Sequence, residues 1–303
     1  MPSPLKKLFA PDKTPLFPFI DGLRALSILW VISLHTLWMF GYFLDQQAFI
    51  EFSTRAELSP FFQGHLAVDS FFVISGFLIG YYLFREYQQH QTLQLKQFYL
   101  RRALRLLPAY FAVMLMVAAT YPQNLHSLWA NIFYVNNFLP LEQQFMPWTW
   151  SLAIEEQFYT LLPCLILLIA KTRRTLLVLV LLFLLSFIIR FSLSYSNQLQ
   201  LPLPLHEVID KQLMYNYFDL IYDKSYSRYG GLIVGVIVAY LSVSTQTVEF
   251  LKTHHYCPQK LKRLCLIQRH MPKIKSTTNV SLKKNENFCD RAWEWIVTLK
   301  KWK

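Results

Sequence analysis

FIDGLRALSILWVISLHTLWMFGYF, residues 19 to 43, is an apolar run long enough to cross a lipid bilayer as one helix. Arg24 stands near its start and His35 in its middle. Eleven residues are close to three helical turns, so both side chains share one face, with His35 roughly 16 Å further along the axis. An ionisable side chain at membrane depth costs free energy, so a functional role is its default interpretation. A histidine that hydrogen-bonds between helices for packing is the alternative.

The composition of the whole chain is that of a membrane protein. Hydrophobic residues make up 54% and aromatic residues 17% of the 303 positions, which excludes an ordinary soluble domain. No small-residue cleavage site follows the first run, so we expect it to stay as an anchor. The pattern predicts an all-α, polytopic transmembrane helical bundle with about six spans. The expected spans are Ala25 to Phe43, Leu66 to Phe84, Leu104 to Tyr121, Leu152 to Ala170, Thr175 to Leu193 and Tyr229 to Leu241.

Positive charges are concentrated between these spans. The net charge is +12, but the basic groups precede the first span, separate the second from the third and follow the fourth. The positive-inside rule therefore assigns all three groups to the cytoplasm, which favours membrane orientation over nucleic-acid binding. The groups are Lys6, Lys7 and Lys13; Arg85, Lys96, Arg101, Arg102 and Arg105; and Lys171, Arg173 and Arg174.

The same rule decides how the stretch Asn124 to Leu139 is interpreted. If it were a span, the basic group after the fourth span would lie outside, so we interpret it as a short helix or re-entrant element on the outer side. The connections Gln46 to Gln63 and Tyr195 to Ser227 are then also expected outside. The N-terminus and the C-terminal tail are expected in the cytoplasm.

Residues 1–243 are expected to form the transmembrane domain, and residues 244–303 a basic cytoplasmic tail or the remainder of a truncated domain. The four cysteines show no CxxC spacing and none lies in an outside segment, so no disulfide framework is predicted. The histidines and cysteines of the tail fit no standard zinc spacing, so no metal site is predicted. These tail residues are His254, His255, Cys257, Cys265 and His270.

The second span carries a carboxylate and two glycines at helical spacing, Asp69, Gly76 and Gly80. The small residues leave a groove in which another helix or an acyl chain can approach the backbone closely. Asp69 has two interpretations. It is either a functional carboxylate or a first-turn acidic residue that is favoured by the helix dipole.

Three arginines introduce the third span in FYLRRALRLLPAYF. Arg101, Arg102 and Arg105 lie within a turn and a half of helix and predict a cationic cluster at the cytoplasmic boundary. Guanidinium groups suit phosphate recognition. The alternative is that they only fix orientation and contact anionic lipid headgroups.

The fourth span opens with PWTWSLAIEEQFYTLLP. Trp148, Ser151, Glu155 and Tyr159 fall on one stripe at near-helical spacing, and Trp148 fits an interfacial aromatic belt. A carboxylate at the depth of Glu155 must be paired, protonated or exposed to a wet cavity. We expect it at the same outer level as Asp69, on the side towards which His35 points.

Four blocks in this order resemble acyltransferase family 3: FIDGLRALSILWVISLH, VDSFFVISGFLIG, FYLRRALRLLPAY and WTWSLAIEEQFY. The hallmark of this family is an arginine and a histidine separated by ten residues, which Arg24 and His35 match. The resemblance covers Pro18 to Leu241, more loosely in YDKSYSRYGGLIVGVIVAYL. Members of the family are integral-membrane O-acyltransferases, typically bacterial, that modify cell-surface glycans.

The resemblance implies that an acyl group, most often acetyl, moves from cytoplasmic acyl-CoA to a hydroxyl outside. The expected acceptor is O-antigen, exopolysaccharide or another glycan of the cell envelope. Acyl-CoA is then a co-substrate and no permanently bound cofactor is expected. The expected location is the bacterial cytoplasmic membrane.

The resemblance also implies roles for single residues. Acyl transfer to a hydroxyl needs a base, and histidine titrates in the right range, so His35 is the expected base. An acyl-enzyme on His35 is the alternative. Glu155 or Asp69 would orient the imidazole. The residues expected to hold acyl-CoA are Arg24, Arg101, Arg102 and Arg105, and those expected to line the acyl groove are Gly76, Gly80, Ser151 and Trp148.

Two other functions compete with acyl transfer. Family members usually have about ten spans of this length, so a chain with six is expected to be truncated, and an inactive member is one alternative. The other is a transporter in which His35, Asp69 and Glu155 form a path for protons or a solute.

Overall fold

The computed structural model describes residues 18–244 except 42, 122, 173 and 200–210. By internal contacts the chain divides into Met1–Val248 and Glu249–Lys303, and all described residues belong to the first unit. Within the described part, every regular element is a helix, which confirms the predicted all-α bundle. The basic tail and its histidines and cysteines lie outside the described residues.

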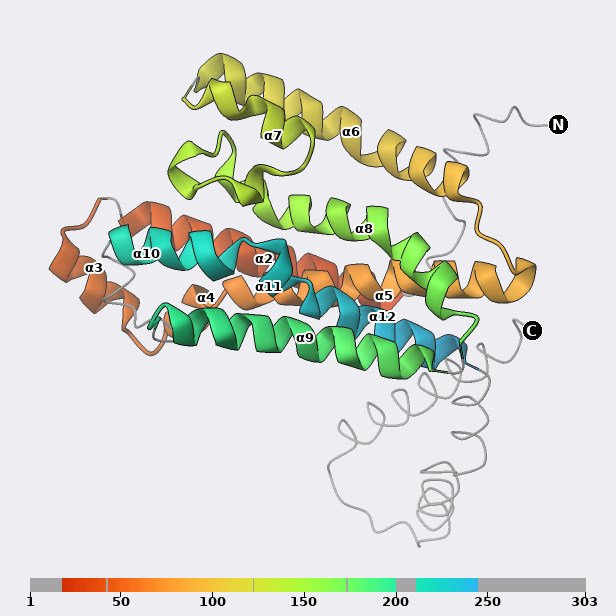
Figure 1. Cartoon of the computed structure of the whole chain (residues 1–303). Helices are drawn as coiled ribbons and strands as arrows, with labels where there is room; N and C mark the ends of the chain where they lie inside the picture. The colour runs from red at the N-terminus through yellow and green to blue at the C-terminus, as the bar shows by residue number, and fades with distance from the viewer. Residues whose placement is uncertain (1–17, 42, 122, 173, 200–210, 245–303) are drawn as a thin grey trace, which may run out of the picture. The chain divides into compact units, whose positions relative to one another are not determined.

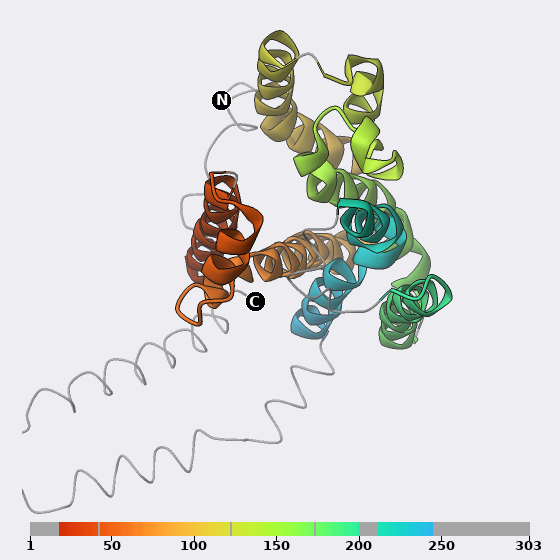
Figure 2. The same cartoon turned by 90° about the vertical axis from the view of Figure 1, so that its left-hand side faces the viewer.

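Five helices are long and apolar enough to cross a membrane, and they run side by side in Figure 1 and are seen nearly end-on in Figure 2. All five coincide with predicted spans. They are α2 (Pro18–Gly41), α5 (His65–His90), α6 (Leu95–Thr120), α8 (Trp150–Ile169) and α9 (Thr175–Ser196).

The sixth predicted span is realised as a shorter helix, α12 (Gly230–Val243), which directly follows α11 (Ser225–Arg228). At 1.5 Å per residue, residues 225–243 extend about 28 Å. This is close to the roughly 30 Å thickness of a bilayer's hydrocarbon core. Together α11 and α12 are therefore long enough to serve as the sixth span.

The centre of the bundle is the contact between α5 and α12. A Cβ atom on Gly76 would lie 2.0 Å from the Leu232 carbonyl oxygen, and one on Gly235 would lie 2.1 Å from the Val73 carbonyl oxygen. Only glycine allows the two backbones to approach this closely. Next to this contact, α8 and α9 complete a hydrophobic core of Leu83, Phe84, Leu162, Ile166, Ile169, Leu179, Val236 and Ala239.

Two short helices, α3 (Gln46–Ser53) and α4 (Ser59–Phe62), connect α2 to α5. The ring of Trp38 packs against Phe49 and Phe62 with centroids 5.2 and 6.5 Å away. The Trp30 indole donates a 2.7 Å hydrogen bond to the Pro60 carbonyl. The connection thus holds the C-terminal half of α2 beside the start of α5.

The stretch between α6 and α8 contains only short helices, which confirms that Asn124 to Leu139 is not a span. Its helices are η1 (Leu125–Ser127), α7 (Leu128–Ile132), η2 (Asn136–Phe138), η3 (Leu141–Gln143) and η4 (Pro147–Thr149). Three asparagines of this stretch, Asn131, Asn136 and Asn137, are completely buried. Thr149 accepts hydrogen bonds from Asn131 and Asn136 at 3.0 and 3.3 Å.

The connection Tyr195 to Ser227, which is expected on the outer side, is mostly helical in its second half. Residues 211–228 form α10 (Lys211–Tyr217), a π-helical turn η5 (Phe218–Tyr222) and α11. Asp223 and Lys224 between them are buried, at 0 and 4% exposure. The Asp223 carboxylate can be buried because it is paired with the Lys224 ammonium group.

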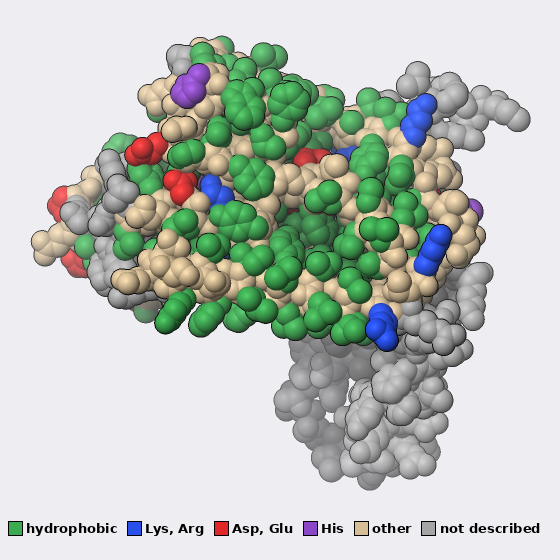
Figure 3. All heavy atoms as spheres, in the orientation of Figure 1, with side chains coloured by type: hydrophobic (Ala, Val, Ile, Leu, Met, Phe, Trp, Pro, Cys, Tyr) green, Lys and Arg blue, Asp and Glu red, His purple; other side chains and the backbone are tan. Residues whose placement is uncertain are grey.

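Charge is unevenly distributed over the molecule. On the face shown in Figure 3, hydrophobic side chains cover the middle, Lys and Arg gather at the end where α8 joins α9, and Asp and Glu lie mostly towards the other end. An apolar belt between differently charged ends is typical of a multi-pass membrane protein. By the positive-inside rule, the basic end is the predicted cytoplasmic end.

Candidate active site

A small pocket of about 170 Å³ lies where α2, α5 and α8 meet. Val31 of α2 lines it together with Val68, Phe71 and Phe72 of α5 and Ser151, Leu152 and Glu155 of α8. Glu155 is the charged side chain among these otherwise mostly apolar residues. The pocket therefore offers one carboxylate in a largely apolar setting, close to the expected outer ends of the spans.

His35 lies one helical turn beyond Val31 on α2, and its side chain is exposed. Its Nδ1 atom is 2.8 Å from the Val31 carbonyl oxygen. A carbonyl oxygen can only accept a hydrogen bond, so Nδ1 must carry the proton. In the neutral imidazole, Nε2 is then left with its lone pair free, which is the state that a general base requires.

The described partner of the imidazole is thus a backbone carbonyl and not a carboxylate. No described ion pair joins His35 to Glu155 or Asp69. The expectation that one of these carboxylates orients the ring remains a prediction. The sequence places Val31 one helical turn before His35, but it does not show that the ring bonds to a backbone carbonyl.

Glu155 accepts a 3.0 Å hydrogen bond from the Ser75 hydroxyl of α5. Ser75 is itself buried. This contact fixes the carboxylate at the boundary between α5 and α8, where one oxygen is held and the side chain still lines the pocket. The fold therefore holds the Glu155 carboxylate at the wall of the pocket.

The next residue, Glu156, projects to the other side of α8 and pairs with Arg102 of α6. The Arg102 Nε atom lies 2.9 and 3.0 Å from the two carboxylate oxygens, and Nη2 also bonds to Oε1. The guanidinium carbon stacks 3.5 Å from the centroid of the Tyr159 ring. Arg102 is therefore occupied by a forked ion pair and a cation–π contact.

The three arginines do not form one cluster in the structure. Arg101 and Arg105 are exposed, whereas Arg102 is turned towards α8. Because α6 begins at Leu95, these residues lie roughly 9 to 15 Å along the helix rather than at its end. Arg24 is exposed on α2, outside the pocket. Sequence spacing suggested a shared face but could not reveal the partner of Arg102.

Asp69 is also occupied, by an arginine that the sequence analysis missed. The Arg228 guanidinium lies 3.0 Å from the Asp69 carboxylate and is 7% exposed. It sits among the rings of Phe72, Trp150 and Tyr222, with the Tyr222 centroid 5.1 Å away. Arg228 lies directly before the apolar run Tyr229 to Leu241. A charge at the start of a span needs a partner, so the sequence did contain a signal for this residue.

Arg190, near the C-terminal end of α9, packs against the end of α11. It is half-buried, and its Nη2 donates a 2.8 Å hydrogen bond to the Ser227 carbonyl. Ser227 precedes Arg228, so this bond ties α9 to the end of α11. Arg190 is therefore part of the packing around the Asp69–Arg228 pair.

The expected acyl groove along Gly76 and Gly80 is filled by α12. A Cβ atom on Gly80 would lie 3.1 Å from the Ala239 Cβ atom, and Gly76 is even closer to its neighbour. The spacing of the glycines allowed either another helix or an acyl chain to lie against them. The structure has a helix there, so the expected acyl path along these glycines was wrong. Ser151 does line the small pocket, whereas the Trp148 side chain is 53% exposed.

A network of buried polar groups joins the stretch 125–149 to residues 211–228. Lys224 Nζ lies 3.0 Å from Asp223 and donates a 2.7 Å hydrogen bond to the Asn137 carbonyl. Gln144 donates a 2.8 Å hydrogen bond to Asp223, and Gln157 donates one to Asn137. Burial raises the pKa of the Asp223 carboxyl, which the Gln144 bond and the Lys224 charge partly oppose.

A second, larger cavity of about 530 Å³ lies at the opposite end of the bundle, where α5, α8 and α12 end. It is separate from the pocket near Glu155, and the residues lining the two do not overlap. Among the described residues, no group of three His, Cys, Asp or Glu could hold a metal ion.

Comparison with known proteins gives one family. Residues 17–245 match the acyltransferase 3 family model, which is described as an acyltransferase domain. Peptidoglycan O-acetyltransferase OatA of Listeria monocytogenes is 36% identical over 177 residues, which cover 51% of this chain and 25% of that protein. O-acetyltransferase OatA of Staphylococcus aureus is 34% identical over 183 residues, 54% of this chain and 26% of that protein. The matched region thus spans about a quarter of these relatives, and no solved structure matches.

Proposed function

The chain belongs to acyltransferase family 3, and on that premise we propose that it is a membrane O-acetyltransferase. It would move an acetyl group from acetyl-CoA to a hydroxyl group of a cell-envelope glycan. The observation that carries the proposal is the hydrogen bond from His35 Nδ1 to the Val31 carbonyl, 2.8 Å long. It leaves Nε2 as a base on a helix that also lines the pocket of Glu155.

In the proposed reaction, the acceptor hydroxyl gives its proton to His35 Nε2 while its oxygen attacks the thioester carbonyl carbon. The carbon–sulfur bond then breaks, and the leaving thiolate of CoA takes the proton from the imidazolium. An ester and free CoA result, and the imidazole returns to its starting state. The Val31 carbonyl keeps the proton on Nδ1 throughout, so the ring needs no tautomer exchange between turnovers.

Glu155 is the carboxylate that we propose for the site, because it lines the same pocket as Val31, the hydrogen-bond partner of His35. A negative charge there would stabilise the imidazolium that forms during transfer. Asp69 would contribute indirectly, since its carboxylate is already paired with Arg228. The hydroxyl of Ser75 would hold Glu155 in place during the reaction.

The donor is proposed to approach from the basic end of the molecule. Of the four arginines expected to bind acyl-CoA, Arg24, Arg101 and Arg105 are exposed and available to its phosphates. Arg102 is engaged by Glu156, so we assign it to positioning α6 against α8. We place the protein in the bacterial cytoplasmic membrane with this end in the cytoplasm, because its lysines and arginines follow the positive-inside rule.

The acceptor is proposed to be a glycan because both named relatives are O-acetyltransferases, one of them of peptidoglycan. An acceptor on the outer side would approach over the buried polar network of Asn137, Asp223 and Lys224. Its amide, carboxylate and ammonium groups bind mainly to one another, so it would shape the entrance rather than bind sugar hydroxyls directly. Which glycan is modified would then depend on the surface above it.

The test is the acetyl content of envelope glycans, measured by mass spectrometry in cells that carry the His35→Ala variant. We expect loss of the protein-dependent acetyl groups, with an unchanged amount of protein in the membrane. His126→Ala is the matched control, because His126 is exposed in the stretch between α6 and α8 and should have no effect. Full acetylation in the His35→Ala cells would overturn the proposal.

A further inference from the structure

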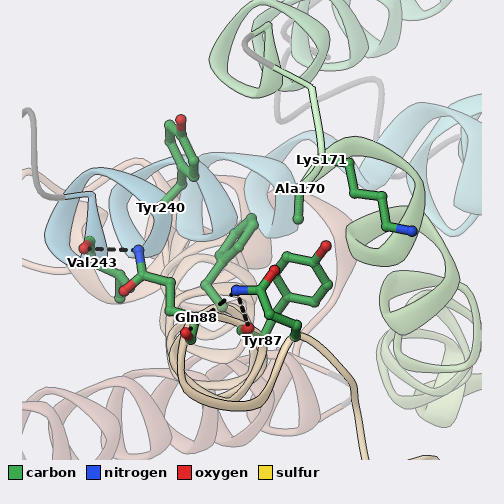
Figure 4. A pocket seen from close by; sticks show the side chains of 8 residues that line it. Tyr87, Gln88, Ala170, Lys171, Tyr240 and Val243 are labelled. Atoms are coloured by element: carbon green, nitrogen blue, oxygen red, sulfur yellow. Dashed lines mark hydrogen bonds between the residues drawn. The ribbon is translucent and has the colours of Figure 1, made fainter.

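The larger cavity, at the predicted cytoplasmic end, has walls from three helices (Figure 4). Tyr87 and Gln88 come from α5, Tyr240 and Val243 from α12, and Lys171 from the turn after α8. Its volume of about 530 Å³ falls within the range of typical ligand sites. Neither the proposed chemistry at His35 nor the expected arginine cluster uses any of these residues.

Lys171 supplies the cavity with an uncompensated positive charge. It is exposed, and among the described residues its ammonium group has no ion pair and no hydrogen bond. A lysine ammonium is a mobile point charge that commonly binds phosphate. The cavity therefore has one group that favours an anion.

The opposite wall offers aromatic faces and hydrogen-bond acceptors. Tyr240 packs edge-on against Phe84 with ring centroids 5.3 Å apart, and Tyr87 is 6% exposed. The Gln88 amide nitrogen donates a 3.2 Å hydrogen bond to the Val243 carbonyl, which leaves the amide oxygen as an acceptor. Both α5 and α12 end here, and helix C-termini favour positive or hydrogen-donating groups.

A cavity lined by a lysine from the turn after α8 and by aromatic rings and acceptors from α5 and α12 is suited to a ligand with a phosphate and an amino group. We propose that this cavity binds the head of an amino-bearing phosphate ester. The phosphate would lie on Lys171, and the amino-bearing part would lie between Tyr240 and the amide oxygen of Gln88. Two molecules at a cytoplasmic membrane surface have this chemistry: the adenine nucleotide of acyl-CoA, a source that rests on the proposed function, and an ethanolamine phospholipid.

The experiment measures binding of coenzyme A and, separately, of short-chain phosphatidylethanolamine to the purified full chain in detergent. For the ligand that binds, we expect Lys171→Gln to weaken affinity roughly tenfold, the loss of one charge-assisted contact to phosphate. Lys96→Gln is the matched control, because it removes the same charge from the exposed first turn of α6, outside the cavity. Tyr240→Leu should also weaken binding, since it removes the ring and keeps an apolar side chain.

Binding of either ligand with a loss specific to Lys171→Gln supports the proposal, and the ligand that binds identifies the source. The proposal is overturned if neither ligand binds, or if Lys96→Gln weakens binding as much as Lys171→Gln does. No acceptor is present and no acetyl group is transferred in this assay. Its failure would therefore leave the proposed role of His35 untouched, and the failure of that role would leave this result untouched.

Discussion

Replacing Gly76 by alanine tests whether the close contact between α5 and α12 holds the bundle together. The added Cβ atom would lie 2.0 Å from the Leu232 carbonyl oxygen, a distance at which backbone must move. Overpacking of this kind costs about 3 kcal/mol at the upper end of its usual range. Alanine recovers about 1 kcal/mol through its better helix propensity, so a net loss of about 2 kcal/mol is expected.

Two other glycines allow the loss of stability to be compared across three alanine variants with different contacts. Gly80→Ala would meet the Ala239 side chain at 3.1 Å, so its cost should be smaller and should nearly cancel the gain in propensity. Gly22 has no atom within 4 Å of its added Cβ, so Gly22→Ala should leave stability unchanged or raise it by about 1 kcal/mol.

The assay is reversible unfolding of the purified protein in mixed detergent micelles, followed by loss of helical circular dichroism. The midpoint should fall for Gly76→Ala, change little for Gly80→Ala and hold or rise for Gly22→Ala. If Gly76→Ala unfolds no more easily than Gly22→Ala, the close approach of α5 and α12 does not contribute as argued.

Two ion pairs give further predictions by the same unfolding assay. Arg102→Ala leaves the Glu156 carboxylate unpaired between helices and should cost about 3 kcal/mol, whereas Arg101→Ala removes an exposed charge and should cost less than about 1 kcal/mol. Equal losses in these two variants would contradict the assignment of Arg102 to positioning. Asp69→Asn leaves the buried Arg228 guanidinium without its carboxylate and should cost about 2 kcal/mol, discounted because Asp69 is partly exposed. Exchanging the two residues, Asp69→Arg with Arg228→Asp, should restore part of that loss, and no restoration would refute a direct pair.

The helices could be predicted from sequence because a span leaves a continuous signal. Apolar runs of sufficient length located all five long helices and α12, and the positive-inside rule correctly rejected Asn124 to Leu139 as a span. The segment 211–228 was missed for the opposite reason. It contains no long apolar run, and although Lys224 is adjacent to Asp223, the Gln144 amide that also bonds to this carboxylate is 79 positions away in sequence.

The candidate site was predictable only in part. His35 and Glu155 stood out because a charge within an apolar run demands an explanation. Their immediate partners could not be predicted, because the Ser75 hydroxyl that bonds to Glu155 is 80 positions away in sequence. The pairing of Arg102 with Glu156 was hidden for the same reason, because spacing within one helix says nothing about which side chain on a neighbouring helix it meets.

The interlocking of α5 and α12 also limits how the protein can move. A carbonyl seated in a glycine notch on each helix prevents sliding along the common axis, so the two should behave as a single rigid body. Most of α2 is exposed on the described surface, and it packs against α5 and against α4 in the short connection after it. Of the described long helices, α2 is therefore the one that we expect to move relative to this rigid body, and it is also the helix that carries His35.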